Sequence, residues 1–517
     1  MALILAGLGA TLMRADLKAV GNLNLPGPVF IPTSPGEPSP TVATPRRRVL
    51  AVLIDGLRDD VALRQPFIAR LAREGVRAEL WADMPTYSAA QWVAALSGVR
   101  PADSGVRANF GLLRTPLDNV ARRVTRGGGV AVNLADDVDW WTRLFGDDWT
   151  RATVERGDIV AAAQPEMGDG VDFLFVHLTS ADTVGHTLGA GSQAYLNAAR
   201  ASDERLRLLA QAWGWPNATV VAFSDHGHLH AGGHGGDEAE VRRAFFVGSG
   251  PGLRAGGRVQ ARMIDAAPTL AALLGVAAPA QAEGRALVEL LDAPPAARLA
   301  LAAADAERGV RVAAAVLDGR RGLEAVEQQR RLLRGGAVAL CLVLAVVVIR
   351  RARPCARLGL LVGAASLGVT ATFYLVTFGR ISFSADRDGT VLVYNTVYFG
   401  FAACALTFAA PIAALATRRL TVSDATAMSF LAVAGAAPLA LAMFVACGAF
   451  DLRLTCEPAW FAAGPLLAYG ALIPVVMCAA AMSGLAGLLA LARAPVPFMV
   501  AAPAAALPAA PPRHSRA

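Results

Sequence analysis

The sequence predicts an α/β domain with a largely parallel central sheet flanked by helices, followed by an all-α membrane domain of about five helices. Between residues 48 and 330, short apolar runs alternate with segments of mixed polarity, which is the pattern of strands and helices in α/β domains. After Gly335, long apolar runs with arginines between them dominate the chain, as in multi-span membrane proteins.

Four short apolar runs predict buried strands, at 48–54, 173–177, 218–223 and 243–247. Segments of helical character predict helices at 66–75, 89–96, 195–213 and 263–274. In open α/β sheets, functional residues lie beyond the carboxyl ends of the strands. The residues that directly follow these runs are therefore the first candidates for a functional site.

Five longer apolar runs predict a multi-pass integral membrane protein, at about 336–349, 358–378, 391–416, 427–449 and 460–491. Arginines in the loops 350–357 and 418–419 place those loops in the cytoplasm by the positive-inside rule. This orientation puts the α/β domain on the extracytoplasmic side of the membrane. Arg330, Arg331 and Arg334 flank the first run on its other side and oppose that orientation.

The predicted domain organisation has five parts. They are a short apolar N-terminus with a proline-rich linker (1–47), the α/β domain (48–290), a helical connector (291–334), the membrane domain (335–492) and an alanine- and proline-rich tail (493–517). The apolar residues 1–13 are too few to span a bilayer comfortably, so they fit a weak signal, an anchor remnant or a misassigned start.

Charge and cysteine usage exclude some functions. The net charge is +7, but many arginines lie beside the apolar runs, which indicates membrane flanks rather than nucleic-acid binding. All six cysteines lie after residue 340, in the membrane half. A metal in the α/β domain must therefore be bound by Asp, His, Glu or hydroxyl ligands.

Acids and histidines at the predicted strand ends form a candidate metal site. Asp55 follows one run, Asp225 and His226 follow another, and a glycine-rich loop then carries His234. If the segment after the run 173–177 is helical, a further pair lies one turn apart on one face, Asp182 and His186. These six residues suffice for two divalent metals in N/O coordination. The alternative is a polar turn that happens to be rich in histidine.

Ser88 and Thr86 are the candidate nucleophiles. Ser88 is expected at the N-terminus of the helix 89–96, where free N–H groups and the helix dipole favour a phosphate. The alternative role for Ser88 is a plain helix cap. Thr86 follows Pro85 and would lie in the preceding loop.

An ordered set of motifs resembles the alkaline phosphatase superfamily, and more closely its phosphodiesterase and nucleotide-pyrophosphatase branch and the GPI ethanolamine-phosphate transferases. The motifs are VLIDGLRDD (52–60), MPTYSAAQWVAALSG (84–98), FVHLTSADTVGH (175–186), FSDHGHLHAGGHGGDEAEV (223–241) and MIDAAPTLAALLGV (263–276). The resemblance covers residues 48–285, and those transferases also follow the enzyme domain with membrane helices.

The resemblance implies a role for each candidate. One metal, zinc or manganese, would be bound by Asp182, His186 and His234, and a second by Asp55, Asp225, His226 and the nucleophile. The spacing to Gly98 selects Ser88 as the nucleophile, with Thr86 as the rival, and Asn109 would bind a phosphate oxygen. A sulfatase that depends on a cysteine-derived formylglycine is not expected, because the domain has no cysteine.

These features predict a membrane-anchored phosphotransferase or phosphodiesterase acting on a lipid or lipid-linked phosphodiester, such as a phosphoethanolamine donor. A membrane-tethered nucleotide pyrophosphatase acting on soluble substrates is a close alternative. A transporter or scaffold with a vestigial enzyme domain is disfavoured, because the apolar runs contain almost no ionisable residues. The sequence does not indicate an oligomeric state.

The remaining histidines and two tryptophans have less specific interpretations. His177 lies in an apolar run and is predicted to be a core histidine with a hydrogen-bond partner. His228 and His230 either support the metal ligands or are merely exposed. Trp140 and Trp141 are predicted to pack in the core rather than line a substrate entrance.

Overall fold

The structure is a computed structural model that describes residues 47–109, 111–319, 391–417, 419–434 and 457–493, together with short stretches and isolated positions elsewhere, such as Asn24. Of the predicted membrane runs, 336–349 lies almost entirely outside the described residues, and 358–378 and 427–449 lie outside them in part. The segment 1–13 and the tail after 493 also lie outside them, apart from isolated positions.

The α/β domain is built on one eight-stranded sheet with the order β4-β3-β5-β1-β6-β7-β2-β8. Strand β7 runs antiparallel to both of its neighbours, and the other described pairs are parallel, so the predicted largely parallel sheet is confirmed. The strands are β1 (Val49–Ile54), β2 (Val76–Trp81), β3 (Ala131–Asp136), β4 (Arg151–Glu155), β5 (Phe173–Leu178), β6 (Thr219–Phe223), β7 (Arg243–Ser249) and β8 (Arg258–Arg262).

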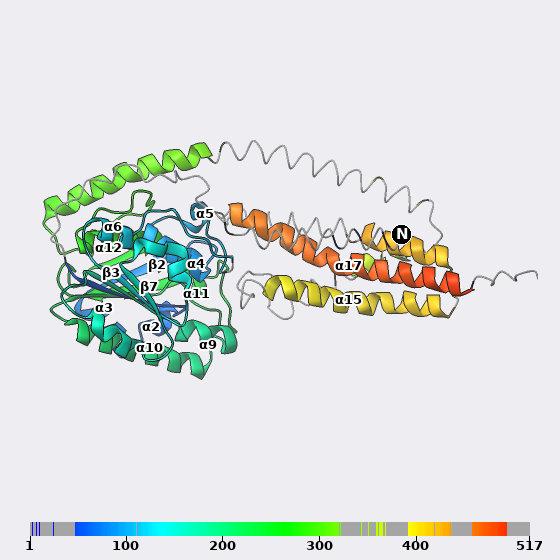
Figure 1. Ribbon diagram of the computed structural model, residues 1–517, viewed down its shortest axis with the longest axis horizontal. Coiled ribbons are helices and arrows are strands. Elements are labelled where there is room, and N and C mark those ends of the chain that lie inside the picture. Colours follow the sequence, from blue (N-terminus) through cyan, green and yellow to red (C-terminus); the bar gives the residue numbers. More distant parts are fainter. Residues whose placement is uncertain are drawn as a thin grey trace, which may run out of the picture.

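Helices cover the sheet and connect its strands (Figure 1). In the α/β domain they are α2 (Asp59–Ala62), α3 (Pro66–Glu74), α4 (Ser88–Ser97), α5 (Pro101–Ser104), α6 (Val120–Arg126), α7 (Trp140–Phe145), α8 (Ile159–Ala163), α9 (Ser180–Leu188), α10 (Gln193–Trp213), α11 (Ala239–Arg242) and α12 (Ala266–Leu274), with 3-10 turns η1 (Gly146–Asp148), η2 (Gln164–Glu166) and η3 (Met263–Asp265).

The register of the central strands brings their carboxyl ends together. Strand β1 lies between β5 and β6, with Ile54 opposite Leu178 and Leu53 opposite Phe223. Every residue of these three strands is buried, which explains why each reads as a continuous apolar run. The residues that follow them, including Asp55 and Asp225, therefore emerge at one edge of the sheet.

The sequence analysis did not identify strands β2, β3, β4 and β8. In β2, buried and half-buried residues alternate, and β4 and β8, the edge strands of the sheet, contain several exposed residues. Their side chains face solvent on one or both faces, so these segments lack the apolar run that identifies a central strand. Strand β3 is buried but carries Asn133 and Asp136, which interrupt its apolar run.

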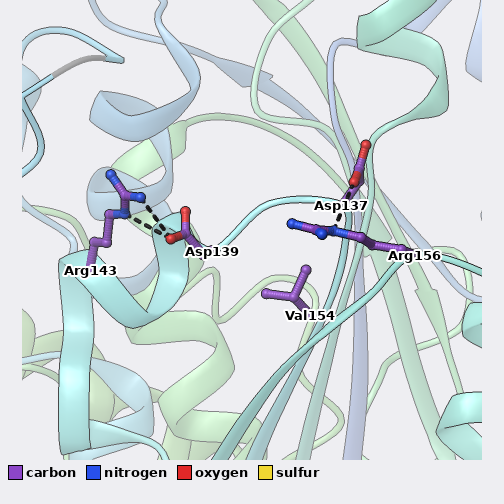
Figure 2. Close-up of a pocket in the computed structure, with 5 residues that line it drawn as sticks. All are labelled: Asp137, Asp139, Arg143, Val154 and Arg156. Atoms are coloured by element: carbon purple, nitrogen blue, oxygen red, sulfur yellow. Dashed lines mark hydrogen bonds and ion pairs between the residues drawn. The ribbon is translucent and has the colours of Figure 1, made fainter.

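A cavity of about 470 Å³ opens at the carboxyl ends of β3 and β4 (Figure 2). Two ion pairs line it, Arg143–Asp139 at 2.8 Å and Arg156–Asp137 at 3.5 Å. Strands β3, β5 and β1 are neighbours and run parallel, so their carboxyl ends lie on the same side of the sheet. The cavity therefore opens on the side where Asp55 lies. None of the predicted site residues lines it.

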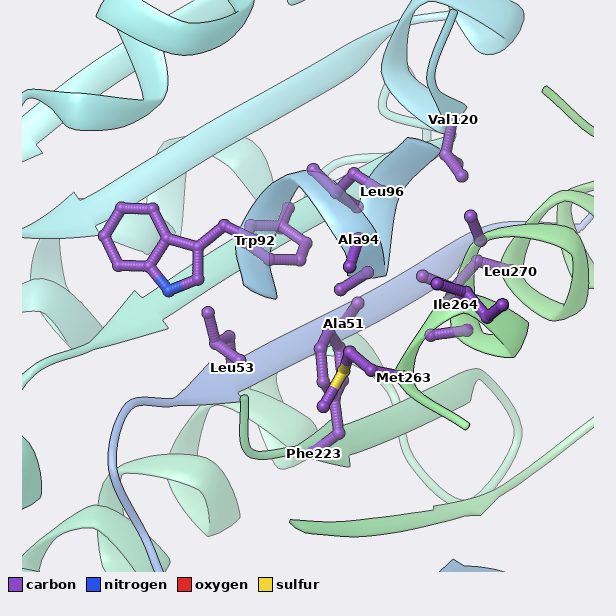
Figure 3. Packing of buried hydrophobic residues seen from close by; sticks show 14 of the residues in the cluster. Ala51, Leu53, Trp92, Ala94, Leu96, Val120, Phe223, Met263, Ile264 and Leu270 are labelled. Carbon is purple, nitrogen blue, oxygen red and sulfur yellow. The ribbon is translucent and has the colours of Figure 1, made fainter. Parts of the chain in front are cut away.

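The hydrophobic core has one half on each face of the sheet, because successive side chains of a strand point to opposite faces. Ala51 and Leu53 of β1 face α4 and α12, whereas Leu50 and Val52 belong to the other half, with residues of α3 and α10. Figure 3 shows Trp92 of α4 above Leu53, within this first half of the core. This packing fixes α4, whose first residue is Ser88, over the end of β1.

A helix over residues 295–319 follows the α/β domain, within the segment 291–334 that we interpret as a connector. Its Arg308 is fully buried and donates hydrogen bonds to two backbone carbonyls of the α/β domain, Ala282 (2.9 Å) and Gly284 (2.6 Å). The described part of the connector is therefore attached to the domain through a charged side chain.

The described part of the membrane half contains two long helices, α15 (Val391–Ala416) and α17 (Glu457–Arg493), close to two of the predicted runs. Side chains of the two helices pack together, among them Phe408 and Val475. By length and hydropathy, one described segment is a candidate membrane span, Leu472–Ala492. The predicted number of five spans remains a prediction.

Candidate metal centre

The six predicted ligands lie close together beyond the carboxyl ends of the central strands. Asp55 directly follows β1, and Asp225 and His226 follow β6. Helix α9, which follows β5, carries Asp182 and His186, and their side chains meet at 3.3 Å as predicted for one helical turn. The loop after β6 returns His234 to the same place.

His226 is the centre of the first group of potential ligands. Its Nδ1 donates to the carbonyl oxygen of Gly227 at 3.1 Å, which leaves Nε2 to face the carboxylates. That Nε2 lies 3.4 Å from Asp55 Oδ1 and 3.4 Å from Asp225 Oδ2. The ligand atoms of these three buried residues lie within 4.8 Å of one another.

The second group surrounds Asp182. The Nδ1 of His234 donates to the carbonyl oxygen of Thr86 at 2.8 Å, which leaves Nε2 to face the other ligands. This Nε2 lies 3.1 Å from His186 Nε2 and 3.7 Å from Asp182 Oδ1. The rings of His226 and His234 stack with centroids 3.8 Å apart, so the two groups are contiguous.

The electrostatics of the site favour a bound cation. Burial and the neighbouring carboxylates of Asp225 and Asp182 raise the pKa of Asp55 well above its usual value. Burial would also raise the pKa of Asp182, but hydrogen bonds with His186 and His228 outweigh it and hold that pKa well below its usual value. Burial lowers the pKa of His234, so this imidazole is neutral and can act as a ligand.

The residues present fit divalent metal ions. Among the described residues, the ion-pair partners of the three carboxylates are all histidines, and Asp55 Oδ1 is buried without a hydrogen-bond partner. A buried oxygen of this kind costs free energy unless a cation or donor binds it. Asp and His are also the usual N/O ligands of zinc and manganese.

The two candidate nucleophiles have different environments. Ser88 Oγ lies 3.1 Å from His226 Nε2, and therefore faces the first group of ligands. The hydroxyl of Thr86 donates to the carbonyl oxygen of Gly236 (3.0 Å) and accepts from the N–H of Gly235 (2.9 Å). Thr86 thus connects the glycine-rich loop to the start of α4 through two hydrogen bonds. The residue that caps α4 is Tyr87, so the plain-cap interpretation of Ser88 is wrong.

Asn109 also lies at the start of α4, as its predicted phosphate contact requires. Its Oδ1 accepts a hydrogen bond from the N–H of Ala89 at 3.0 Å. This contact occupies one of the N–H groups that we expected to be free at the helix terminus. The helix terminus therefore has less capacity to bind a phosphate than the sequence suggested.

Two buried donors contact the carboxylates, and the sequence analysis did not assign either to the site. His177 is buried, as predicted for a core histidine, but its partner is Asp55, with Nε2 3.0 Å from Oδ2. Trp92 Nε1 donates to Asp225 Oδ2 at 2.9 Å. Trp141 stacks on Trp92 with ring centroids 4.4 Å apart, which confirms its predicted packing role. The one sequence signal for the contact of His177 with Asp55 is its place at the end of the apolar run 173–177, because the ends of these runs lie near the site.

The structure also separates His228 from His230. His228 is buried, and its Nε2 lies 2.8 Å from Asp182 Oδ1, whereas His230 is exposed. The ligand atoms of His228, Asp182, His226 and His234 lie within 4.8 Å of one another. Of the two histidines that the sequence left undecided, His228 therefore belongs to the site.

This chain is similar to one family model and to two known proteins. A family model described as type I phosphodiesterase / nucleotide pyrophosphatase matches residues 49–116 and 111–241. GPI ethanolamine phosphate transferase 3, catalytic subunit, of Mus musculus is 28% identical in an alignment of 325 positions, and the match covers 54% of this chain and 29% of the transferase. A 2,3-bisphosphoglycerate-independent phosphoglycerate mutase of Cereibacter sphaeroides (strain ATCC 17025 / ATH 2.4.3) is 30% identical over 132 residues, 24% of this chain and 25% of the mutase.

The chain thus spans less than a third of the length of these two relatives. Among solved structures, murine ectonucleotide pyrophosphatase / phosphodiesterase 5 matches 45% of this chain and 96% of its own, with 14% identity and a TM-score of 0.39.

Proposed function

Because the matched family and the relatives fit the alkaline phosphatase superfamily, as the motifs predicted, we propose that this chain is a membrane-anchored phosphotransferase or phosphodiesterase with two divalent metals. The observation that carries the proposal is the position of Ser88 Oγ, 3.1 Å from His226 Nε2, which itself lies 3.4 Å from one oxygen of Asp55 and 3.4 Å from one of Asp225. A serine hydroxyl beside such ligands has the surroundings of a metal-activated nucleophile.

The ligands would divide between the two metals as the resemblance implies. Asp55, Asp225 and His226 would bind one ion, and Asp182, His186 and His234 the other. Zinc is the first candidate, because three of the six ligands are imidazoles, and manganese is the second. Bound ions of this kind lower the pKa of a hydroxyl and neutralise the oxygens of a phosphoryl group in transfer.

The chain's own residues would carry out the reaction in two steps. In the first step, Ser88 Oγ attacks phosphorus, the Oγ–P bond forms, and the bond from phosphorus to the leaving alcohol breaks. Asn109, at the start of α4, would hold a non-bridging oxygen of the phosphoryl group. In the second step an alcohol attacks the phosphoserine in a transferase, or water does so in a hydrolase, and Ser88 is released.

We propose a lipid or lipid-linked phosphodiester as the substrate, with a phosphoethanolamine donor as the first candidate. The transferase relative and the candidate span Leu472–Ala492 support this substrate class. In Figure 1, α4, α9 and α11 lie on the side of the α/β domain toward α15 and α17, which favours access from a membrane. The arginine pattern of the loops favours an extracytoplasmic α/β domain.

A membrane-tethered nucleotide pyrophosphatase is the second candidate, and the family-model match favours it. Two assays separate the candidates. Lipid mass spectrometry should show a phosphoester-modified lipid in cells that express the wild-type chain, and this lipid should be missing in cells with Ser88→Ala. The purified chain should not cleave nucleotide diphosphate esters at a comparable rate. Rapid nucleotide cleavage with unchanged lipids would contradict the lipid proposal and support the second candidate.

A further inference from the structure

Two buried histidines outside the proposed ligand set occupy equivalent positions in the two ligand groups. His177 contacts Asp55 in the first group, and His228 contacts Asp182 in the second. Both side chains have an exposed fraction of 0%. In both, Nδ1 is buried and has no hydrogen-bond partner among the described residues, so the polar contact of each ring is made through Nε2.

The contact of His177 divides the two oxygens of Asp55 between two partners. His177 Nε2 lies 3.0 Å from Oδ2, while Oδ1 lies 3.4 Å from His226 Nε2 and has no hydrogen-bond donor. The ring of His177 is held in place by Trp92 and Trp141, at centroid distances of 4.5 and 5.6 Å. Oδ1 is therefore the oxygen that remains available to a metal.

His228 and His186 contact different oxygens of Asp182, and the oxygen nearest His228 also lies 3.7 Å from His234 Nε2. His228 Nε2 lies 2.8 Å from Oδ1, while Oδ2 lies 3.3 Å from His186 Nε2. Two glycines make room for the His228 ring. A Cβ at Gly185 would lie 2.5 Å from the ring, and a Cβ at Gly56 would lie 2.9 Å from Nε2. Such close packing leaves the imidazole little freedom to turn away from Asp182.

We propose that His177 and His228 are a pair of positioning residues, one for each metal, and that each donates its Nε2–H to one oxygen of a carboxylate and so presents the other oxygen to the ion. The inference rests on the proposed two-metal function. In each pair the Nε2 faces a carboxylate oxygen, which accepts hydrogen bonds, so each ring donates from that nitrogen. Hydrogen bonds to the ligands of a metal commonly change its affinity by about 10–100-fold.

The test measures metal binding to the full-length chain in detergent, after the metals are removed with a chelator. Zinc is titrated into the wild type by calorimetry, and bound zinc is counted by elemental analysis. His177→Phe preserves the aromatic packing and removes the donor, and His228→Leu removes the other donor. His177→Gln and His228→Gln keep an N–H donor near the position of Nε2. His230→Leu, at an exposed site, is the matched control.

Each donor should affect one binding step. His177→Phe and His228→Leu should each weaken one of the two zinc-binding steps about 10–100-fold, and the Gln variants should recover most of that loss. A His234→Ala background, which removes a ligand of the second site, identifies the affected step. The remaining step should then be weakened by His177→Phe but not by His228→Leu.

Four outcomes would overturn the inference. If the wild type binds two zinc ions and both donor variants bind them within about twofold of its affinity, the positioning role is wrong while the proposed function stands. If the wild type binds none, the proposed function itself fails. If His228→Gln loses zinc as fully as His228→Leu, His228 is a ligand rather than a donor. Circular dichroism shows whether each metal-free variant folds. If His177→Phe or His228→Leu does not fold, and the Gln variant at the same position folds but binds zinc as weakly as the unfolded variant, the role of that histidine is structural.

Discussion

The hydroxyl of Ser88 lies 3.1 Å from Nε2 of His226, although the two residues are 138 positions apart in the chain. One begins α4 and the other follows β6, so the contact exists only because α4 packs over the end of the central strands. It also distinguishes the two candidate nucleophiles, because the hydroxyl of Thr86 is occupied by the glycine-rich loop.

Replacement of the nucleophile should abolish turnover while metals are retained. Ser88→Ala should lower kcat by roughly four orders of magnitude or more, because the covalent step requires the Oγ. Metal content should stay near that of the wild type, because the six Asp and His ligands remain. Rapid-quench trapping and peptide mass spectrometry should locate the phosphoryl group on Ser88. A label on Thr86 would show that the register of the motif is wrong.

Replacement of Thr86 should have a smaller effect. Its hydroxyl makes two hydrogen bonds to the loop that carries His234, and each such bond contributes about 1 kcal/mol. Thr86→Ala should therefore lower kcat/KM about tenfold. Thr86→Ser, which keeps the hydroxyl, should restore most of the activity. Equal losses in the two Thr86 variants would mean that the methyl group, and not the hydroxyl, matters.

Metal content tests the ligand assignment directly. Elemental analysis of the purified chain should show close to two zinc or manganese ions, because the site offers two groups of Asp and His ligands. His226→Ala and Asp182→Ala should each lose metal and activity. His230→Ala, at the exposed position, should keep both. An active, folded chain without divalent metal would refute the two-metal proposal.

The pH dependence of stability should reveal the buried carboxylate of Asp203. This side chain on α10 accepts hydrogen bonds from the first turn of α3, from the N–H groups of Phe67 (3.0 Å) and Ile68 (2.8 Å). Burial nevertheless raises its pKa above the usual value, against the effect of those bonds. Between the usual pKa of an aspartate and this raised pKa, the folded state therefore binds more protons than the unfolded state. The contribution of Asp203 to stability is lost as pH rises through the raised pKa.

Asp203→Asn should flatten that part of the stability profile. The measurement is urea unfolding of the full-length chain in detergent, followed by tryptophan fluorescence, at several pH values between about 4 and 7. The denaturant dependence of the free energy of unfolding should be the same in both proteins. A variant that loses more stability than the wild type as pH rises would contradict the direction of the pKa shift.

Membrane topology can be mapped with reporter fusions. The arginines of the loops 350–357 and 418–419 predict that a reporter after Arg419 is cytoplasmic and that one at Arg387 is exported. The reason is that positively charged loops are retained in the cytoplasm. A phosphatase reporter should therefore be active at Arg387 and inactive after Arg419. The reverse pattern would place the α/β domain in the cytoplasm.

The sequence alone determined the central strands and most of the candidate ligands. Strands β1, β5 and β6 are buried on both faces, so each appears as an apolar run, and parallel neighbours deliver the residues after these runs to one edge. Asp55, Asp225 and His226 could therefore be placed together without a structure. The helical spacing of four residues did the same for Asp182 and His186.

Only the tertiary structure decided which partners surround those ligands. The contact of His177 with Asp55 joins residues 122 positions apart, and that of Trp92 with Asp225 joins residues 133 apart. A buried imidazole or indole has the same local sequence pattern whether its N–H meets a ligand carboxylate or a backbone carbonyl. The partner is selected by the packing of α4 and β5 against the end of β1. That packing depends on the whole hydrophobic core and cannot be read from the periodicity of apolar residues in any one segment.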